Sequence, residues 1–306
     1  MHNFFWGATS LALHAPPSLQ TSALGDVHIT HASGGRFDVK GYHDKVFVLH
    51  QASGITLNAR FTYTSFLLPP GDMRQLAGVH LVHGSHMTQA YVTLLASTMG
   101  RLVHVSLGSG HPFAALVQIE SRRRNAKKRQ LINEAWLRSN DQPLKMGNIE
   151  IEMQPTSPVA LVVSNGDWKY TVKPGIYLTP TSTSTPQTRY RVDITVQALV
   201  NPLKLPVAPH GLVGQGFDGY ATNGMRDSYI PEGNGEFTTA AQGEGAIEGT
   251  VDDYVVASPD PFATAFLYER FYSTVAQQRD VSKLTARRWV GQNLSTLFAI
   301  ANDQPV

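Results

Sequence analysis

The 306-residue chain contains no cysteine. Disulfides, thiolate zinc sites, iron–sulfur clusters and cysteine nucleophiles are therefore excluded together. The absence does not fix the cellular compartment, because an extracellular protein can also fold without disulfides. Localisation and function have to be inferred from other features.

The chain also has few charged residues, and neither sign dominates. Charged side chains make up 16% of the residues, and 25 Lys and Arg against 23 Asp and Glu leave a formal net charge of +2. So small a net charge gives no whole-molecule field that would attract nucleic acid, a membrane surface or an acidic substrate. Apolar runs of about 18 residues are missing as well, so the sequence predicts no membrane span.

A hydrophobic content of 42% is enough for a sizeable core. The first residues, MHNFFWGATSLALHAPP, are apolar and carry no Lys or Arg. They resemble the core of a signal peptide but lack its basic start and a good cleavage site. We expect an ordered N-terminal arm over residues 1–24, with a targeting remnant as the alternative.

Short runs rich in Val, Ile, Thr, Tyr and Phe recur along the chain and are separated by turn signals such as Ser53-Gly54 and Asn165-Gly166. This spacing predicts a mainly all-β protein, an antiparallel β-sandwich or barrel. Alternation in the last run places Tyr190, Val192, Ile194 and Val196 on one buried face. The predicted strands are 36–50, 55–68, 79–84, 90–97, 101–108, 149–154, 160–165, 168–175 and 189–200.

Three segments depart from this pattern. Residues 121–141 predict a helical insertion, because Leu131, Ala135 and Trp136 can share one apolar side. The Ser/Thr/Pro-rich residues 179–188 predict an exposed hairpin connection. Residues 233–306 predict a C-terminal extension packed on the β-domain, helical and amphipathic in its last part.

Two charged groups lie in the segments that depart from the strand pattern. The basic one could hold a glycan or another polyanion, or form a solvated helix face. It consists of Arg122, Arg123, Arg124, Lys127, Lys128 and Arg129. The acidic one, which could hold a cation or again be a solvated surface, consists of Glu244, Glu248, Asp252 and Asp253.

Several motifs point to known chemistry but do not have the context that this chemistry needs. The glycines at 214, 216 and 219 match a dinucleotide fingerprint, yet no apolar strand precedes them and no helix follows. His80, His83 and His86 alternate faces on a strand, which favours ordinary hydrogen bonds over a shared metal. No Gly-x-Ser-x-Gly elbow indicates a serine nucleophile.

The stretch from Gly25 to Phe61 resembles the start of a von Willebrand factor type D domain, with Gly25, Asp26, His28, Phe37 and Asp38 in register. A second segment, Gly211 to Gly219, resembles the closing loop of that family. The closest resemblance is to the cysteine-free subgroup of root-cap and algal or protist proteins, which share an AQ-x-EGAIEG block and an aromatic tail. The resemblance implies two packed antiparallel sheets, so the expected fold is a β-sandwich over residues 25–232.

In calcium-binding members of this family, an Asp of the opening motif and oxygens of the closing loop hold the metal. The first of these positions is Ser33 here, which has no carboxylate, and Val213 stands where the loop cysteine would be. The loop offers Gln215, Asp218, Asn223 and Asp227 as ligands, so the resemblance implies at most a weakened Ca²⁺ site.

Three functions remain open from the sequence. The first is a non-enzymatic structural or adhesion protein, extracellular or at the cell surface, that acts through protein–protein or protein–glycan contacts and possesses apolar arms for self-assembly. The second is a calcium-dependent binding module. The third is a polysaccharide-acting enzyme with a non-local site built from groups such as Asp26, His28, Asp218 and Asp227.

Overall fold

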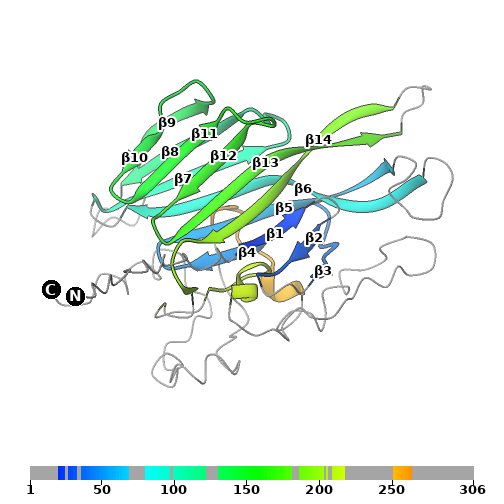
Figure 1. The fold of residues 1–306 in the computed structure, drawn as a ribbon, viewed down its shortest axis with the longest axis horizontal. Helices are drawn as coiled ribbons and strands as arrows, with labels where there is room; N and C mark the ends of the chain where they lie inside the picture. The colour runs from blue at the N-terminus through cyan, green and yellow to red at the C-terminus, as the bar shows by residue number, and fades with distance from the viewer. Residues whose placement is uncertain are drawn as a thin grey trace, which may run out of the picture.

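The computed structural model describes residues 20–24, 27–32, 36–68, 80–96, 99–121, 130–180, 186–202, 205, 209–217 and 251–263. In these residues fourteen strands form an antiparallel network that folds into two layers (Figure 1). The prediction of a mainly all-β protein is therefore confirmed.

One layer, sheet one, has the strand order β4-β5-β6-β7-β8-β9. Its strands are β4 (Lys45–Ala52), β5 (Ile55–Leu68), β6 (His80–Ala96), β7 (Arg101–Gly108), β8 (Ala114–Ser121) and β9 (Gln130–Arg138). Each strand pairs with the next one along the chain, as in a meander of hairpins.

The other layer, sheet two, has the order β10-β11-β12-β13-β14-β1-β2-β3. Its strands are β10 (Leu144–Met146), β11 (Ile149–Gln154), β12 (Ala160–Ser164), β13 (Trp168–Thr179), β14 (Gln187–Ala198), β1 (Gln20–Leu24), β2 (His28–Thr30) and β3 (Arg36–Asp38). Two short 3₁₀ turns, η3 (Gly214–Phe217) and η5 (Val251–Tyr254), lie beside β4.

The two sheets enclose one apolar core. They are joined through the backbone at the single pair Leu67 and Leu178, and β14 packs on β6 and β7 across the interior. Along β14 the side chains of Val192, Ile194 and Val196 are fully buried, as the alternation predicts, whereas Tyr190, predicted on the same face, is only partly buried. This burial supplies most of the driving force that keeps the layers together.

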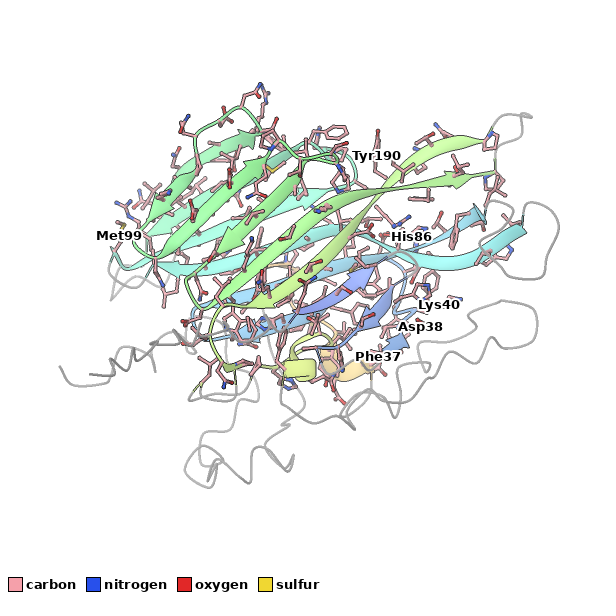
Figure 2. All side chains as sticks on the ribbon, viewed as in Figure 1. Phe37, Asp38, Lys40, His86, Met99 and Tyr190 are labelled. Atoms are coloured by element: carbon pink, nitrogen blue, oxygen red, sulfur yellow. The ribbon has the colours of Figure 1, made fainter. Side chains whose placement is uncertain are left out.

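Two long hairpins extend beyond the body of the sandwich, one from each sheet (Figure 1). They are β5–β6 and β13–β14, and the second confirms the predicted connection, since Thr179 pairs with Gln187. His86 packs between them against the rings of Phe66 and Tyr177, at centroid distances of 4.6 and 4.3 Å. Figure 2 shows His86 and Tyr190 in this region.

The helix predicted over 121–141 is wrong in the part that the structure describes, because residues 130–138 form strand β9. The spacing of Leu131, Ala135 and Trp136 fits a helix. However, residues 130–138 pair along their whole length with strand β8, with Arg138 opposite Ala114 at one end and Gln130 opposite Ser121 at the other. Ile132 and Trp136 suit a strand. Tertiary pairing therefore overrides the local pattern.

Smaller differences concern strand boundaries. The run 36–50 is broken by a turn in which Gly41 and Asp44 have positive φ, and the runs 79–84 and 90–97 belong to the single strand β6. Strands β1, β2, β8 and β10 were not predicted. The predicted helix near the C-terminus lies outside the described residues, and no described helix is long and apolar enough to cross a membrane.

Candidate functional site

Residues 209–217, here called the closing segment, lie along the edge of β4. Two backbone hydrogen bonds join Gln51 to His210, and the amides of Leu212 and Val213 donate to the carbonyls of Val48 and Leu49 at 3.1 and 2.8 Å. The segment thus extends sheet one beyond β4. It also covers an edge that would otherwise be open to another chain.

The close approach of the closing segment to β4 requires a glycine at position 211. Gly211 has φ +105°, a conformation that residues with a Cβ rarely adopt. A Cβ at this position would collide with the carbonyl group of Leu49. Two of the three glycines that matched a nucleotide fingerprint, Gly214 and Gly216, are buried in η3, and Gly219 lies outside the described residues.

Gln215, one of the four predicted calcium ligands, is fully buried in this segment. Its amide nitrogen faces the carbonyls of Gly211 and Leu212 and the hydroxyl of Tyr254, at 3.4 to 3.5 Å. Asp218, Asn223 and Asp227 lie outside the described residues. Among the described residues, no three His, Asp or Glu side chains gather as a metal site would require.

The structure brings together the two motifs on which the family resemblance rests. His31, which follows β2, packs edge-on against Phe37 of β3 at 5.0 Å and approaches the carbonyl of Leu212 at 3.4 Å. A Cβ on Gly216 would lie 2.6 Å from the His31 ring. The opening and closing motifs therefore form one packed unit, although about 180 residues separate them.

His50 on β4 lies at the centre of this unit and is completely buried. Its Nδ1 lies 2.7 Å from the hydroxyl of Tyr170, and its ring packs on Trp168 at 4.4 Å and Phe217 at 5.9 Å. Burial lowers the pKa of His50 from 6.5 to about 3 and raises that of Tyr170 well above its ordinary value. Both side chains are therefore neutral at pH 7 and serve packing.

His28 was predicted as part of a non-local enzyme site. It contacts the carboxylate of Asp38, which the sequence analysis did not include in that site. Its Nδ1 donates to Asp38 across the β2–β3 pair at 2.5 Å, and Figure 2 shows Asp38 on β3 beside Phe37. The ring is half exposed while Asp38 is nearly buried. The proposed companions Asp26, Asp218 and Asp227 lie outside the described residues.

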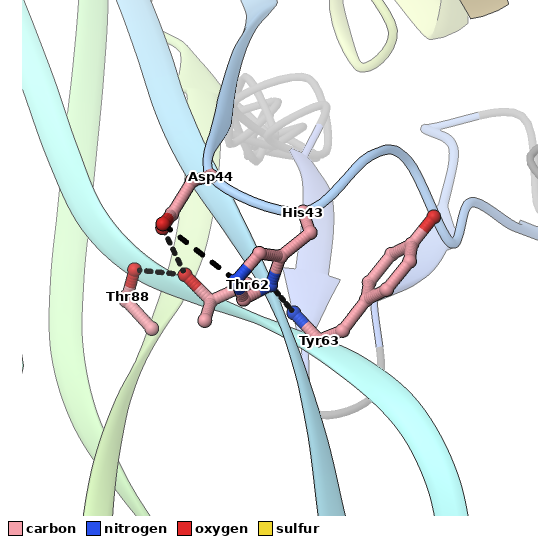
Figure 3. A network of polar contacts seen from close by, with 5 residues as sticks. All are labelled: His43, Asp44, Thr62, Tyr63 and Thr88. Atoms are coloured by element: carbon pink, nitrogen blue, oxygen red, sulfur yellow. Dashed lines mark hydrogen bonds and ion pairs between the residues drawn. The ribbon is translucent and has the colours of Figure 1, made fainter.

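A second polar cluster surrounds the turn between β3 and β4 (Figure 3). The Tyr63 amide donates to Nδ1 of His43 at 3.0 Å, and Thr62 bonds Thr88 at 3.0 Å and Asp44 at 3.4 Å. These contacts attach the turn, in which Asp44 has φ +58°, to β5 and β6. His83 likewise makes an ordinary hydrogen bond, to Ser65 at 2.6 Å, as expected for the strand histidines.

The outer face of sheet one is divided into a covered and an open part. Residues 258–263, the strap, cross β5, β6 and β7: Asn58 donates to the carbonyls of Pro261 and Ala263 at 2.8 and 3.1 Å. The Phe262 ring packs between Tyr91 and His104 at 5.3 and 4.6 Å. Beyond the strap, the same face continues over β8 to the exposed strand β9.

Strand β9 ends sheet one, and within the described part of the chain it pairs only with β8. All of its residues except Leu137 are exposed. Among them are three large apolar side chains, Leu131 at 50%, Ile132 at 47% and Trp136 at 47% exposure. A long apolar edge strand of this kind is uncommon in proteins that act as monomers, because it offers a template to another chain.

One end of this edge is closed by a side chain. Asp141 accepts a hydrogen bond from the Arg138 amide at 2.7 Å, and its own amide donates to the Arg138 carbonyl at 3.0 Å. The backbone groups of Arg138 therefore point away from β8. Because alternate residues of a strand point the same way, those of Trp136 and Glu134 also face outward.

Sequence reasoning missed this edge because it assigned the segment to a helix. The available signal was the β-branched and aromatic content of Gln130–Arg138, which periodicity alone did not reveal. The six basic residues proposed as a polyanion or glycan site lie between positions 122 and 129, immediately before β9 and outside the described residues.

No model of a known protein family matches the chain, and a search of curated proteins finds no significant match. The geometry of the described residues is therefore the basis for the functional proposal.

Proposed function

We propose that this chain is a non-enzymatic structural or adhesion protein that associates with copies of itself, outside the cell or at the cell surface. One observation supports this most: large apolar side chains are exposed on strands, where a neighbouring sheet can cover them. They lie on β9, where Leu131, Ile132 and Trp136 are each about half exposed. Exposed apolar groups gathered in this way mark contact surfaces.

Two further features support the proposal. The closing segment covers the edge of β4, whereas β9 keeps its apolar side chains in solvent. Within the described residues, the fold therefore covers one edge of sheet one and leaves the other available. The resemblance to type D domains, whose folds often build polymers, points in the same direction.

Sedimentation velocity of the full chain tests this function. We expect the average mass to rise above that of the 33.4 kDa monomer as concentration increases through the micromolar range. Exposed apolar strands gain free energy when a second copy removes them from water. A strict monomer throughout about 1 to 200 μM would contradict the proposal.

A further inference from the structure

We infer that strand β9 is the self-association surface, and that two copies pair their β9 strands antiparallel about a twofold axis at Trp136. The inference rests on the proposed function and identifies the surface and the register. In the described residues, the supporting features are the outward-facing backbone of β9, its apolar side chains and the charges on either side of Trp136.

The backbone of β9 can pair with a second copy at Trp136. Since the amide and carbonyl of Trp136 point away from β8, Trp136 of one copy can exchange two hydrogen bonds with Trp136 of the other. Asp141 already occupies the corresponding groups of Arg138. The shared ladder is therefore short and centred on Trp136, and side chains supply the rest of the contact.

The charges select the register. In an antiparallel pair centred on Trp136, Glu134 of each copy lies directly opposite Arg138 of the other. Glu134, Trp136 and Arg138 are exposed and share the outer face of sheet one, since they pair with Gln118, Leu116 and Ala114 of β8. Each dimer then contains two opposite-charge pairs, one on each side of two facing indole rings.

Neighbouring registers lack this complementarity. A shift that places Trp136 opposite Glu134 leaves Arg138 facing Ile132. A further shift places Glu134 opposite Glu134, and like charges directly across a sheet are destabilising. Association about a twofold axis is closed, so the same patch serves both copies. The expected product of this contact is a dimer.

The apolar side chains increase the area that pairing buries. Trp136 packs beside the His111 ring at 5.1 Å, which holds the indole against the outer face. Leu131 and Ile132 are about half exposed at the other end of the strand. A second copy covers part of this surface, which the described residues of one chain leave exposed.

Charge reversal tests the register. We expect Glu134→Arg and Arg138→Glu, each alone, to weaken dimerisation about tenfold, since each creates two like-charge pairs per dimer. The double variant, which restores opposite charges in both pairs, is expected to recover the wild-type dissociation constant within about threefold. Dissociation constants are measured by sedimentation equilibrium of the full chain.

The control is Ile176→Lys, which adds a charge to a more exposed apolar residue on the other sheet and is expected to leave dimerisation unchanged. Far-UV circular dichroism and thermal melts establish that each variant is folded. If the wild type associates but neither single reversal weakens it, the β9 interface is wrong while the proposed function stands. If both single variants weaken dimerisation but the double variant does not recover it, the proposed register is wrong. If the wild type is a monomer, both the β9 interface and the proposed function are wrong.

Discussion

Replacing Gly211 with alanine is expected to lower the free energy of unfolding by about 4 kcal/mol. Gly211 combines a φ of +105° with direct backbone packing on Leu49, so a Cβ is disfavoured by both conformation and space. To avoid the collision between the new Cβ and Leu49, the closing segment would have to move away from β4. The hydrogen bonds on either side, from Gln51 to His210 and from Leu212 to Val48, would then lengthen or break.

Urea denaturation followed by tryptophan fluorescence measures this loss, because Trp168 is buried beneath the closing segment and packs on Phe217 at 4.9 Å. Gly110→Ala is the matched control: no atom lies within 4 Å of a Cβ at that position and its φ is not strained. We expect it to change stability by less than about 0.5 kcal/mol. Equal effects of the two substitutions would show that the closing segment is not held as described.

Acid is expected to destabilise the fold through His50. Its pKa is about 3 in the folded chain and 6.5 in the unfolded one, so between these values the unfolded state binds more protons. The contribution of His50 to the free energy of unfolding is therefore complete above pH 6.5 and is lost as the pH falls toward 3. The loss is about 2 kcal/mol at pH 5 and approaches about 5 kcal/mol at pH 3.

Comparison of the wild type with a variant at position 50 isolates the contribution of His50. In His50→Gln the difference in unfolding free energy between pH 7 and pH 5 should shrink by about 2 kcal/mol. Because this variant removes the contact with Tyr170, imidazole NMR shifts of the wild type give a second measurement. A His50 ring that titrates near pH 6 would refute the buried, neutral assignment.

The fold class could be predicted because apolar and polar residues alternate along a strand that has one buried face and one exposed face. The β5 boundaries match the predicted run 55–68, and β14 shows the expected alternate burial of Val192, Ile194 and Val196. Strand β14 faces the core on one side and is partly exposed on the other, so its pattern can be recognised locally. Short strands such as β2 and β10 contain too few residues to show a period.

The functional surfaces could not be predicted in the same way, because they depend on partners distant in sequence. The role of Gly211 follows from Leu49, and the burial of His50 follows from Tyr170 and Phe217. For β9, the apolar spacing indicated a helix whereas the residue types favoured a strand. Pairing with the edge of β8 determines that the segment is a strand. Because β9 buries only Leu137, its residues show no alternation that could have identified it as a strand.

Hydrogen–deuterium exchange of the full chain at low and high concentration tests most directly whether copies associate through β9. We expect peptides covering Gln130–Leu137 to exchange more slowly at high concentration, because a second copy covers the strand and hydrogen-bonds the Trp136 amide. Peptides covering Ile176–Thr179 on the other sheet should not change. Association accompanied by unchanged exchange in Gln130–Leu137 would show that the copies do not associate through β9.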